Sequence, residues 1–145
     1  WLPQVNGGES LGVLYLSCAI LKLQCIETNQ TVVEESFMSL TVHIFYRGEN
    51  GDARKFAEEM MSSGVVAAIR KEKGNLQYEY FYPVEDTETV LLIDSWENQE
   101  AIDLHHDTEM MQKIIELREK YNLHMKVERF ISDEVPMADK QYIKE

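Results

Sequence analysis

Strand-like and helix-like patterns alternate along this chain from Thr41 onward, and their order limits the possible folds more than any other feature. Segments rich in β-branched and aromatic residues predict strands, whereas apolar residues spaced three and four apart predict helix faces. Strands are expected at 41–48, 75–83, 89–96 and 124–131, and helices within 49–74, 98–106 and 108–121. The elements therefore follow a strand-helix-strand-strand-helix-strand order, in which the second helical part is a pair of helices.

The first helical stretch, ENGDARKFAEEMMSSGVVAAIRKEKG (49–74), has a clear amphipathic pattern. We expect Asn50 or Asp52 to cap its start and Gly74 to end it. Gly64 favours a kink or a split within it, because glycine is a poor helix former. The residues expected to face the core are Ala53, Phe56, Ala57 and Met60.

This order is that of the ferredoxin-like β-α-β-β-α-β fold, an α+β fold in which helices cover one face of a four-stranded antiparallel sheet. The run TVLLIDSW (89–96) is nearly all apolar, so both of its faces should be covered. The face of the sheet without helices still carries apolar side chains, and a small chain buries such a face most easily against a second copy. We therefore expect a homodimer. In the strand expected at 75–83, successive side chains point to opposite faces of the sheet. The side chains expected on one face are Leu76, Tyr78, Tyr80 and Tyr82.

Composition limits the partners that the protein could bind. The chain has 145 residues, enough for one domain with a real core. It carries 14 basic and 26 acidic residues, a net charge of −12, without a basic stripe. Nucleic acid and anionic membranes are therefore not expected partners. Both cysteines, Cys18 and Cys25, precede residue 38, so the remaining chain has no thiol for a disulfide or a metal, and a cytoplasmic location is the simplest expectation.

The N-terminal 37 residues are expected to lie outside the functional domain. MSLTVHIFYRG, beginning at Met38, resembles a natural start just before a strand. The apolar stretch 11–23 is shorter than the roughly twenty residues of a spanning helix and lacks the basic residues that precede the core of a signal peptide. An extra segment that packs on the domain, or an uncleaved anchor, remains an alternative. We expect the domain at 38–132 and a polar C-terminal tail at 133–145.

A tryptophan and a histidine pair follow the third strand, in DSWENQEAIDLHHDTEMM (94–111). On a helix, His105 is expected to share a side with Ala101, Leu104 and Thr108, whereas His106 is turned about 100° away, toward solvent. Adjacent helical histidines cannot both point into one pocket, and helical zinc pairs are spaced by four, so no metal site is expected. His43 and His124 are also expected to be solvated.

Three segments together resemble the antibiotic biosynthesis monooxygenase (ABM) family, which includes quinol monooxygenases. They are IRKEKGNLQYEYF (69–81), LLIDSW (91–96) and EAIDLHHDTEMM (100–111). The family pattern has an Arg, an acid, a Gly and a Tyr around the second strand, then an acid-x-Trp, then a His nine residues after the Trp. Its positions in this chain are Arg70, Glu72, Gly74, Tyr78, Asp94, Trp96 and His105.

The resemblance implies a dimeric α+β barrel with a pocket between sheet and helices in each subunit. Members of this kind oxidise quinols or aromatic polyketides with dioxygen and use no cofactor or metal. His105 is then the expected base, since imidazole titrates near neutral pH, and Trp96 an expected pocket wall and N–H donor. The other residues expected to contact a small aromatic substrate are Tyr46, Arg70, Tyr78, Tyr80, Met110 and Met111.

The chain also departs from its relatives. Many members carry Pro-His where this chain has Glu109-Met110, so a second pocket histidine is missing. The first-strand Asn and second-helix His of haem-degrading relatives are missing too, which argues against haem oxygenation. Two other functions stay open: an isomerase-like proton-transfer enzyme that uses the same histidine, and a ligand-binding module without catalysis. Each of these site residues could also have a purely structural role, in the core or on the surface.

Overall fold

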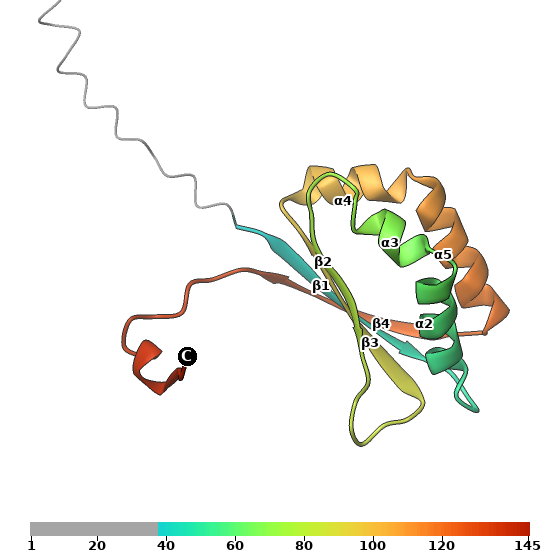
Figure 1. Cartoon of the computed structure of the whole chain (residues 1–145), viewed down its shortest axis with the longest axis horizontal. Coiled ribbons are helices and arrows are strands. Elements are labelled where there is room, and N and C mark those ends of the chain that lie inside the picture. The colour runs from blue at the N-terminus through green and yellow to red at the C-terminus, as the bar shows by residue number, and fades with distance from the viewer. Residues whose placement is uncertain (1–37) are drawn as a thin grey trace, which may run out of the picture. The chain divides into compact units, whose positions relative to one another are not determined.

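The computed structural model describes residues 38–145, so the expected N-terminal extension and its two cysteines lie outside the described residues. The elements are β1 (Leu40–Arg47), α2 (Asp52–Ser62), α3 (Val65–Ile69), β2 (Asn75–Phe81), β3 (Thr89–Trp96), α4 (Gln99–His106), α5 (Glu109–Lys120), β4 (His124–Ile131) and the short 3-10 helix η1 (Lys140–Tyr142). Figure 1 shows the helices gathered on one side of the sheet. The predicted ferredoxin-like α+β fold is confirmed.

The sheet has the order β2-β3-β1-β4, and each neighbouring pair is antiparallel. β3 and β1 are therefore central. In the register of these two strands, Val42 lies opposite Asp94 and Tyr46 opposite Val90. These four side chains point toward the helices and are buried, because every second residue of a strand faces the same side.

Two glycines shape the first helical stretch. Gly51, with φ of 78°, occupies the N-cap of α2, so neither Asn50 nor Asp52 is the cap that we expected. The left-handed backbone at this turn favours glycine, and Asp52 instead sits in the first turn, where a carboxylate suits the helix dipole. Gly64, with φ of 83°, separates α2 from α3, which is the split that the sequence predicted.

A β-bulge interrupts the alternation of β2. The register against β3 shifts between Asn75 and Gln77, so Leu76 leaves the row expected from the sequence and is 54% exposed. Tyr78 and Tyr80 keep the helix-facing side, whereas β2 ends at Phe81 and leaves Tyr82 beyond it. The expected four-residue row is therefore wrong at Leu76, whereas Tyr82 stays on the helix side, because the Arg54 guanidinium of α2 lies 4.5 Å from the centroid of its ring.

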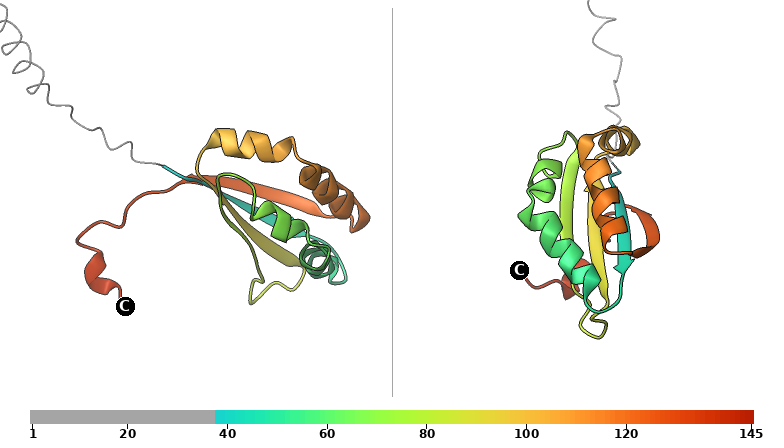
Figure 2. Two further views of the ribbon diagram at one scale, coloured as in Figure 1. Left: turned by 45° about the horizontal axis from the view of Figure 1, so that its top comes forward. Right: turned by 90° about the vertical axis from the view of Figure 1, so that its right-hand side faces the viewer.

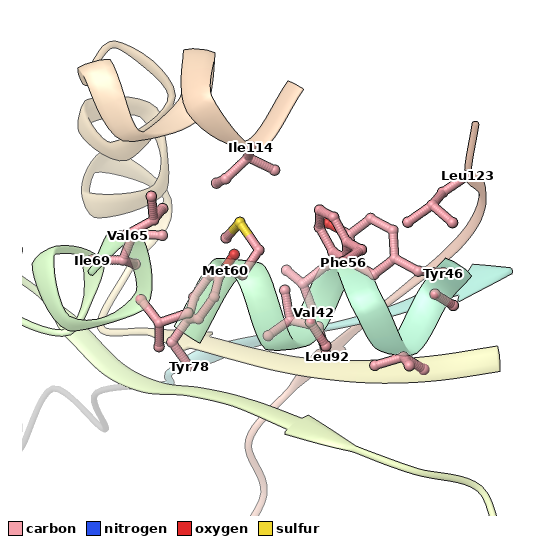
Figure 3. Close-up of a cluster of buried hydrophobic side chains, with 14 of the residues drawn as sticks. Val42, Tyr46, Phe56, Met60, Val65, Ile69, Tyr78, Leu92, Ile114 and Leu123 are labelled. Atoms are coloured by element: carbon pink, nitrogen blue, oxygen red, sulfur yellow. The ribbon is translucent and has the colours of Figure 1, made fainter. Parts of the chain in front are cut away.

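The core fills the space between the sheet and the helices, and Figure 3 shows Met60 and Phe56 of α2 pointing into it beside Tyr46 and Leu92. All four residues expected to face the core from the first helix are buried. Large, fully buried side chains exclude water from this layer, and their burial is the main stabilising contribution to such a fold. The largest are Trp96, Phe56, Met60, Ile69, Leu92, Val66 and Val90.

The side of the sheet away from the helices is open in the single chain. Figure 1 shows the helices on one side of the strands, and the right-hand view of Figure 2 is taken from that side, so that the helices overlap the sheet. We expected both faces of the central strand β3 to be covered. Leu91 and Ile93 of this strand are only partly buried, so a single chain covers one face and leaves the other partly open. β4 is almost wholly exposed along its length. Within the described residues, no helix is both long and apolar enough to cross a membrane.

Candidate functional site

His105 is held by a carboxylate on another part of the chain. It lies on α4, whose start is capped by the Asn98 side chain accepting from the Ala101 N–H at 2.9 Å. Its ring is 4% exposed, and Nδ1 lies 2.6 Å from Oε2 of Glu72, in the turn between α3 and β2. Because a carboxylate can only accept, Nδ1 carries the hydrogen. In neutral imidazole the acceptor lone pair then resides on Nε2.

Thr108 completes this attachment. Its hydroxyl donates to the His105 carbonyl at 2.8 Å and lies 3.3 Å from Oε1 of Glu72. Thr108 is the N-cap residue of α5, yet its side chain makes no capping bond to that helix. Because the single hydroxyl hydrogen is directed to the His105 carbonyl, the hydroxyl lies beside the Glu72 carboxylate without donating to it, and the junction between α4 and α5 lies against the turn that precedes β2.

Trp96 is the wall against which His105 packs. The two rings are 4.8 Å apart between centroids and tilted by 31°, and Trp96 is fully buried at the end of β3. Its indole N–H donates to Oδ1 of Asp94 at 2.6 Å. The N–H that we expected to face a ligand is therefore already bonded, and the indole face is what Trp96 presents to His105.

Asp94 is a buried carboxylate that sequence reasoning placed only in the acid-x-Trp pattern. It is 8% exposed and points toward the helices from the middle of the sheet. Burial raises the pKa of Asp94 to about 7, the Trp96 hydrogen bond lowers it in part, and the Glu72 carboxylate raises it further. The signal in the sequence was an acidic residue on the inward side of an otherwise apolar strand. We call Glu72, Asp94, Trp96 and His105 the polar cluster.

Three tyrosines extend the polar cluster along the sheet. The Tyr78 ring meets the rings of Tyr80 and His105 edge to face, with centroids 6.0 and 6.5 Å apart, and Tyr46 packs on Phe56 at 4.8 Å. Burial raises the pKa of Tyr46, Tyr78 and Tyr80, so each phenol stays neutral and can donate. The buried Tyr80 hydroxyl has no hydrogen-bond partner among residues 38–145.

Arg70 lies at the edge of the sheet, apart from Trp96. It is exposed, and its Nε donates to the Tyr78 carbonyl at 2.9 Å. Arg70 lines two neighbouring hollows, one of about 460 Å³ that includes Tyr78 and one of about 570 Å³ between α2 and β2 that includes Tyr80 and Tyr82. Neither hollow is lined by His105 or Trp96.

Met110 and Met111 occupy the first turn of α5. Both are partly buried and pack against the hydrophobic core. They follow the His105–Thr108 junction directly in the sequence, which places flexible apolar side chains after the residues that fix the histidine. Met110 and Met111 therefore belong to the helix layer, whereas Arg70 belongs to the sheet edge.

The second histidine of the pair points elsewhere. His106 is exposed, as is His124, while His43 is partly buried and packs against Phe130 at 4.7 Å, contrary to the solvated position expected for it. Within residues 38–145, no three His, Cys, Asp or Glu side chains are grouped so that they could hold a metal ion. The site is thus a single buried histidine with a carboxylate on one nitrogen and an indole against its ring.

The fold and this site define a class, namely a ferredoxin-like α+β domain with a histidine enclosed between its sheet and its helices. The profile of one family, described as antibiotic biosynthesis monooxygenase, matches residues 39–117, which is more than half of the chain. The chain belongs to the antibiotic biosynthesis monooxygenase family. No curated protein matches the sequence significantly.

Solved structures show the same fold at low sequence identity. A Pseudomonas aeruginosa protein is 23% identical, with a TM-score of 0.59 over 67% of this chain and 96% of its own. A conserved protein of Methanosarcina mazei is 14% identical, with a TM-score of 0.56 over 65% of this chain and 92% of its own. SnoaB, a cofactor-independent oxygenase from Streptomyces nogalater, is 8% identical, with a TM-score of 0.57 over 68% and 96%. At these identities the likeness concerns the fold.

Proposed function

We propose that this protein is a cofactor-independent monooxygenase that oxidises a quinol or another phenolic aromatic molecule with dioxygen. The observation that carries the proposal is the Glu72–His105 contact of 2.6 Å, which leaves Nε2 as the proton acceptor of a histidine packed on Trp96. Membership of the family and the fold shared with SnoaB, described as a cofactor-independent oxygenase, support the same reaction class.

His105 would act as the base. Nε2 takes the proton of a ring hydroxyl, and the positive charge that forms on the imidazole is stabilised by the Glu72 carboxylate at Nδ1. The apolar surroundings, with Trp96 fully buried, exclude water from the anion. The raised pKa values of Tyr78 and Tyr80 keep their phenols protonated, so they can donate to oxygen atoms of the substrate.

The electrons come from the substrate itself. The deprotonated ring transfers one electron to dioxygen, and the resulting radical pair combines to form a carbon–oxygen bond. Cleavage of the O–O bond leaves one oxygen atom on the ring as a quinone carbonyl and releases the other as water. A phenol and dioxygen together contain the atoms of a quinone and water, so the reaction requires no external reductant.

The functional unit is proposed to be a homodimer. Phe81 and Phe130 are 39% and 47% exposed on the face of the sheet away from the helices, where a second copy would cover them. Leu91 and Ile93 are partly buried on the same face. We assign the functional domain to residues 38–132 and the tail to 133–145, whose residues are all exposed. Because residues 38–145 contain no cysteine, a reducing cytoplasm is the proposed location.

The test is oxygen uptake by chelator-treated protein on a panel of hydroquinones and anthrones. The variants are His105→Ala and Trp96→Phe, and the matched control is His106→Ala, the exposed neighbour. Uptake that persists after chelation, falls by about 100-fold or more in His105→Ala and is unchanged in His106→Ala supports the proposal. Uptake no faster than the spontaneous rate across the panel rejects it.

A further inference from the structure

A hollow at the edge of the sheet has no part in the proposed reaction. It lies between α2 and β2, has a volume of about 570 Å³, and is lined by neither His105 nor Trp96. Met61 and Tyr82 form part of its wall and are 49% and 46% exposed. A hollow of this size can hold a small molecule, and its exposed apolar surface favours a molecule with an apolar part.

Arg70 supplies a positive charge at this hollow. Its Nε donates to the Tyr78 carbonyl at 2.9 Å, which fixes the guanidinium against the edge strand β2. Within residues 38–145, the two terminal nitrogens of Arg70 form neither a hydrogen bond nor an ion pair. The chain has 26 acidic residues, so carboxylates are not scarce. A guanidinium held at one nitrogen keeps a planar pair of donors that matches a carboxylate.

A second guanidinium lies beside the hollow. Arg54 lies on α2, one turn before Ala57, and its guanidinium carbon is 4.5 Å from the centroid of the Tyr82 ring. The Nε of Arg54 is buried without a hydrogen-bond partner, and in the part of the chain that the structure describes Arg54 forms no ion pair. Stacking on the guanidinium orients Tyr82 as a wall, and the charge of Arg54 adds to that of Arg70.

Two carboxylates limit the charge that this hollow would accept. Glu58 of α2 and Glu79 of β2 also line it. They would repel a doubly charged anion such as phosphate, as would the net charge of −12. An anion with one charge keeps its attraction to the Arg70 fork and meets less repulsion. The combination therefore favours a single carboxylate attached to an apolar body.

We propose that this hollow binds a monocarboxylic acid, with the carboxylate on Arg70 and the apolar part against Met61 and Tyr82. The hollow does not include His105 or Trp96, so the inference does not rest on the proposed oxygenase reaction. It also gives Arg70, which lies at the sheet edge rather than beside Trp96, a binding role at its own position.

The experiment compares the binding of octanoate and octanamide by calorimetry at pH 7 and low salt. The two compounds have the same chain and differ in charge. We expect octanoate to bind with a Kd of about 1 mM or lower, and about ten-fold more tightly than octanamide. Arg70→Gln should remove this preference. Arg129→Gln, an exposed arginine on the opposite edge strand β4, is the matched control and should keep it.

Two further measurements locate the site. Met61→Glu, at an exposed position of α2, places a carboxylate in the hollow and should weaken octanoate binding by about ten-fold. Neither inorganic phosphate nor hydroquinone should displace octanoate, because the hollow disfavours a dianion and is separate from the histidine.

Each other outcome rejects the inference. Equal binding of octanoate and octanamide, or binding of neither, would show that the hollow does not recognise a carboxylate. A preference that persists in Arg70→Gln, or is lost equally in Arg129→Gln, would show that Arg70 is not the contact. Unchanged octanoate binding in Met61→Glu, or displacement by phosphate or hydroquinone, would place the acid elsewhere or define another class of ligand. Because no turnover is measured, failure of this site leaves the test of the oxygenase unaffected.

Discussion

The Nδ1 atom of His105 lies 2.6 Å from Oε2 of Glu72, across 33 residues of sequence. Replacing Glu72 by Gln keeps the size of the side chain and removes the charge that stabilises a protonated imidazole. We expect turnover to fall by about 10-fold or more while the fold is retained. The measurement is steady-state oxygen uptake, together with nitrogen NMR of the imidazole, which reports on the tautomer. Thr108→Val keeps the carboxylate and should cost much less, and equal losses in both variants would contradict a charge effect.

A glycine in the turn before β2 is expected to be essential for stability. Gly74 has φ of +84°, and a Cβ placed there would lie 2.6 Å from the Cβ of Ala101 on α4. Gly74→Ala should therefore lower the free energy of unfolding by about 2–4 kcal/mol, from the strained backbone and the overpacking together. Gly51→Ala is the control, since it has φ of +78° with no atom within 4 Å. Urea denaturation of both variants separates the two effects, and equal losses would mean that contact with Ala101 has no cost.

The stability of the protein should depend on pH through Asp94. Its pKa is raised from 3.8 to about 7 in the folded protein, mainly by burial. The folded state then holds this proton more tightly than the unfolded state, so the contribution to stability is fully present below pH 3.8 and is lost as the pH rises to about 7. Asp94→Asn should gain stability relative to the intact protein over that range, by up to about 4 kcal/mol. Melting temperatures from pH 4 to pH 8 measure the difference, and a constant difference would contradict the raised pKa.

Disrupting the open face of the sheet should change the oligomeric state. Ile93 lies in the middle of this face, opposite His43 on β1 and Glu79 on β2. Ile93→Lys places a charge there and should shift the protein from a dimer to a monomer at micromolar concentration, as measured by sedimentation equilibrium. Val84→Lys, in a turn where Val84 is 98% exposed, should leave the mass unchanged. A monomeric mass for the intact protein would overturn the proposed dimer directly.

Local sequence patterns and tertiary contacts compete at several positions of this fold. The stripe on α2 and the break at Gly64 were predicted because helix periodicity and glycine conformation act over a few residues. Alternation failed at Leu76, because the bulge depends on how β2 pairs with β3, which is not a local property. The prediction of a polar N-cap was also wrong, because α2 begins at Gly51, which has a left-handed backbone and no side chain to cap the helix.

Some features of the candidate site could be predicted from the sequence, and others depend on tertiary contacts. The sequence by itself determined the element order, the inward position of His105 and the adjacency of Asp94 and Trp96, because periodicity and the family pattern contain that information. Only the tertiary structure decided that Glu72 reaches His105 and that the Trp96 N–H is used by Asp94. These contacts depend on the distances between side chains on elements that fold together, and a single sequence lists the residues without those distances.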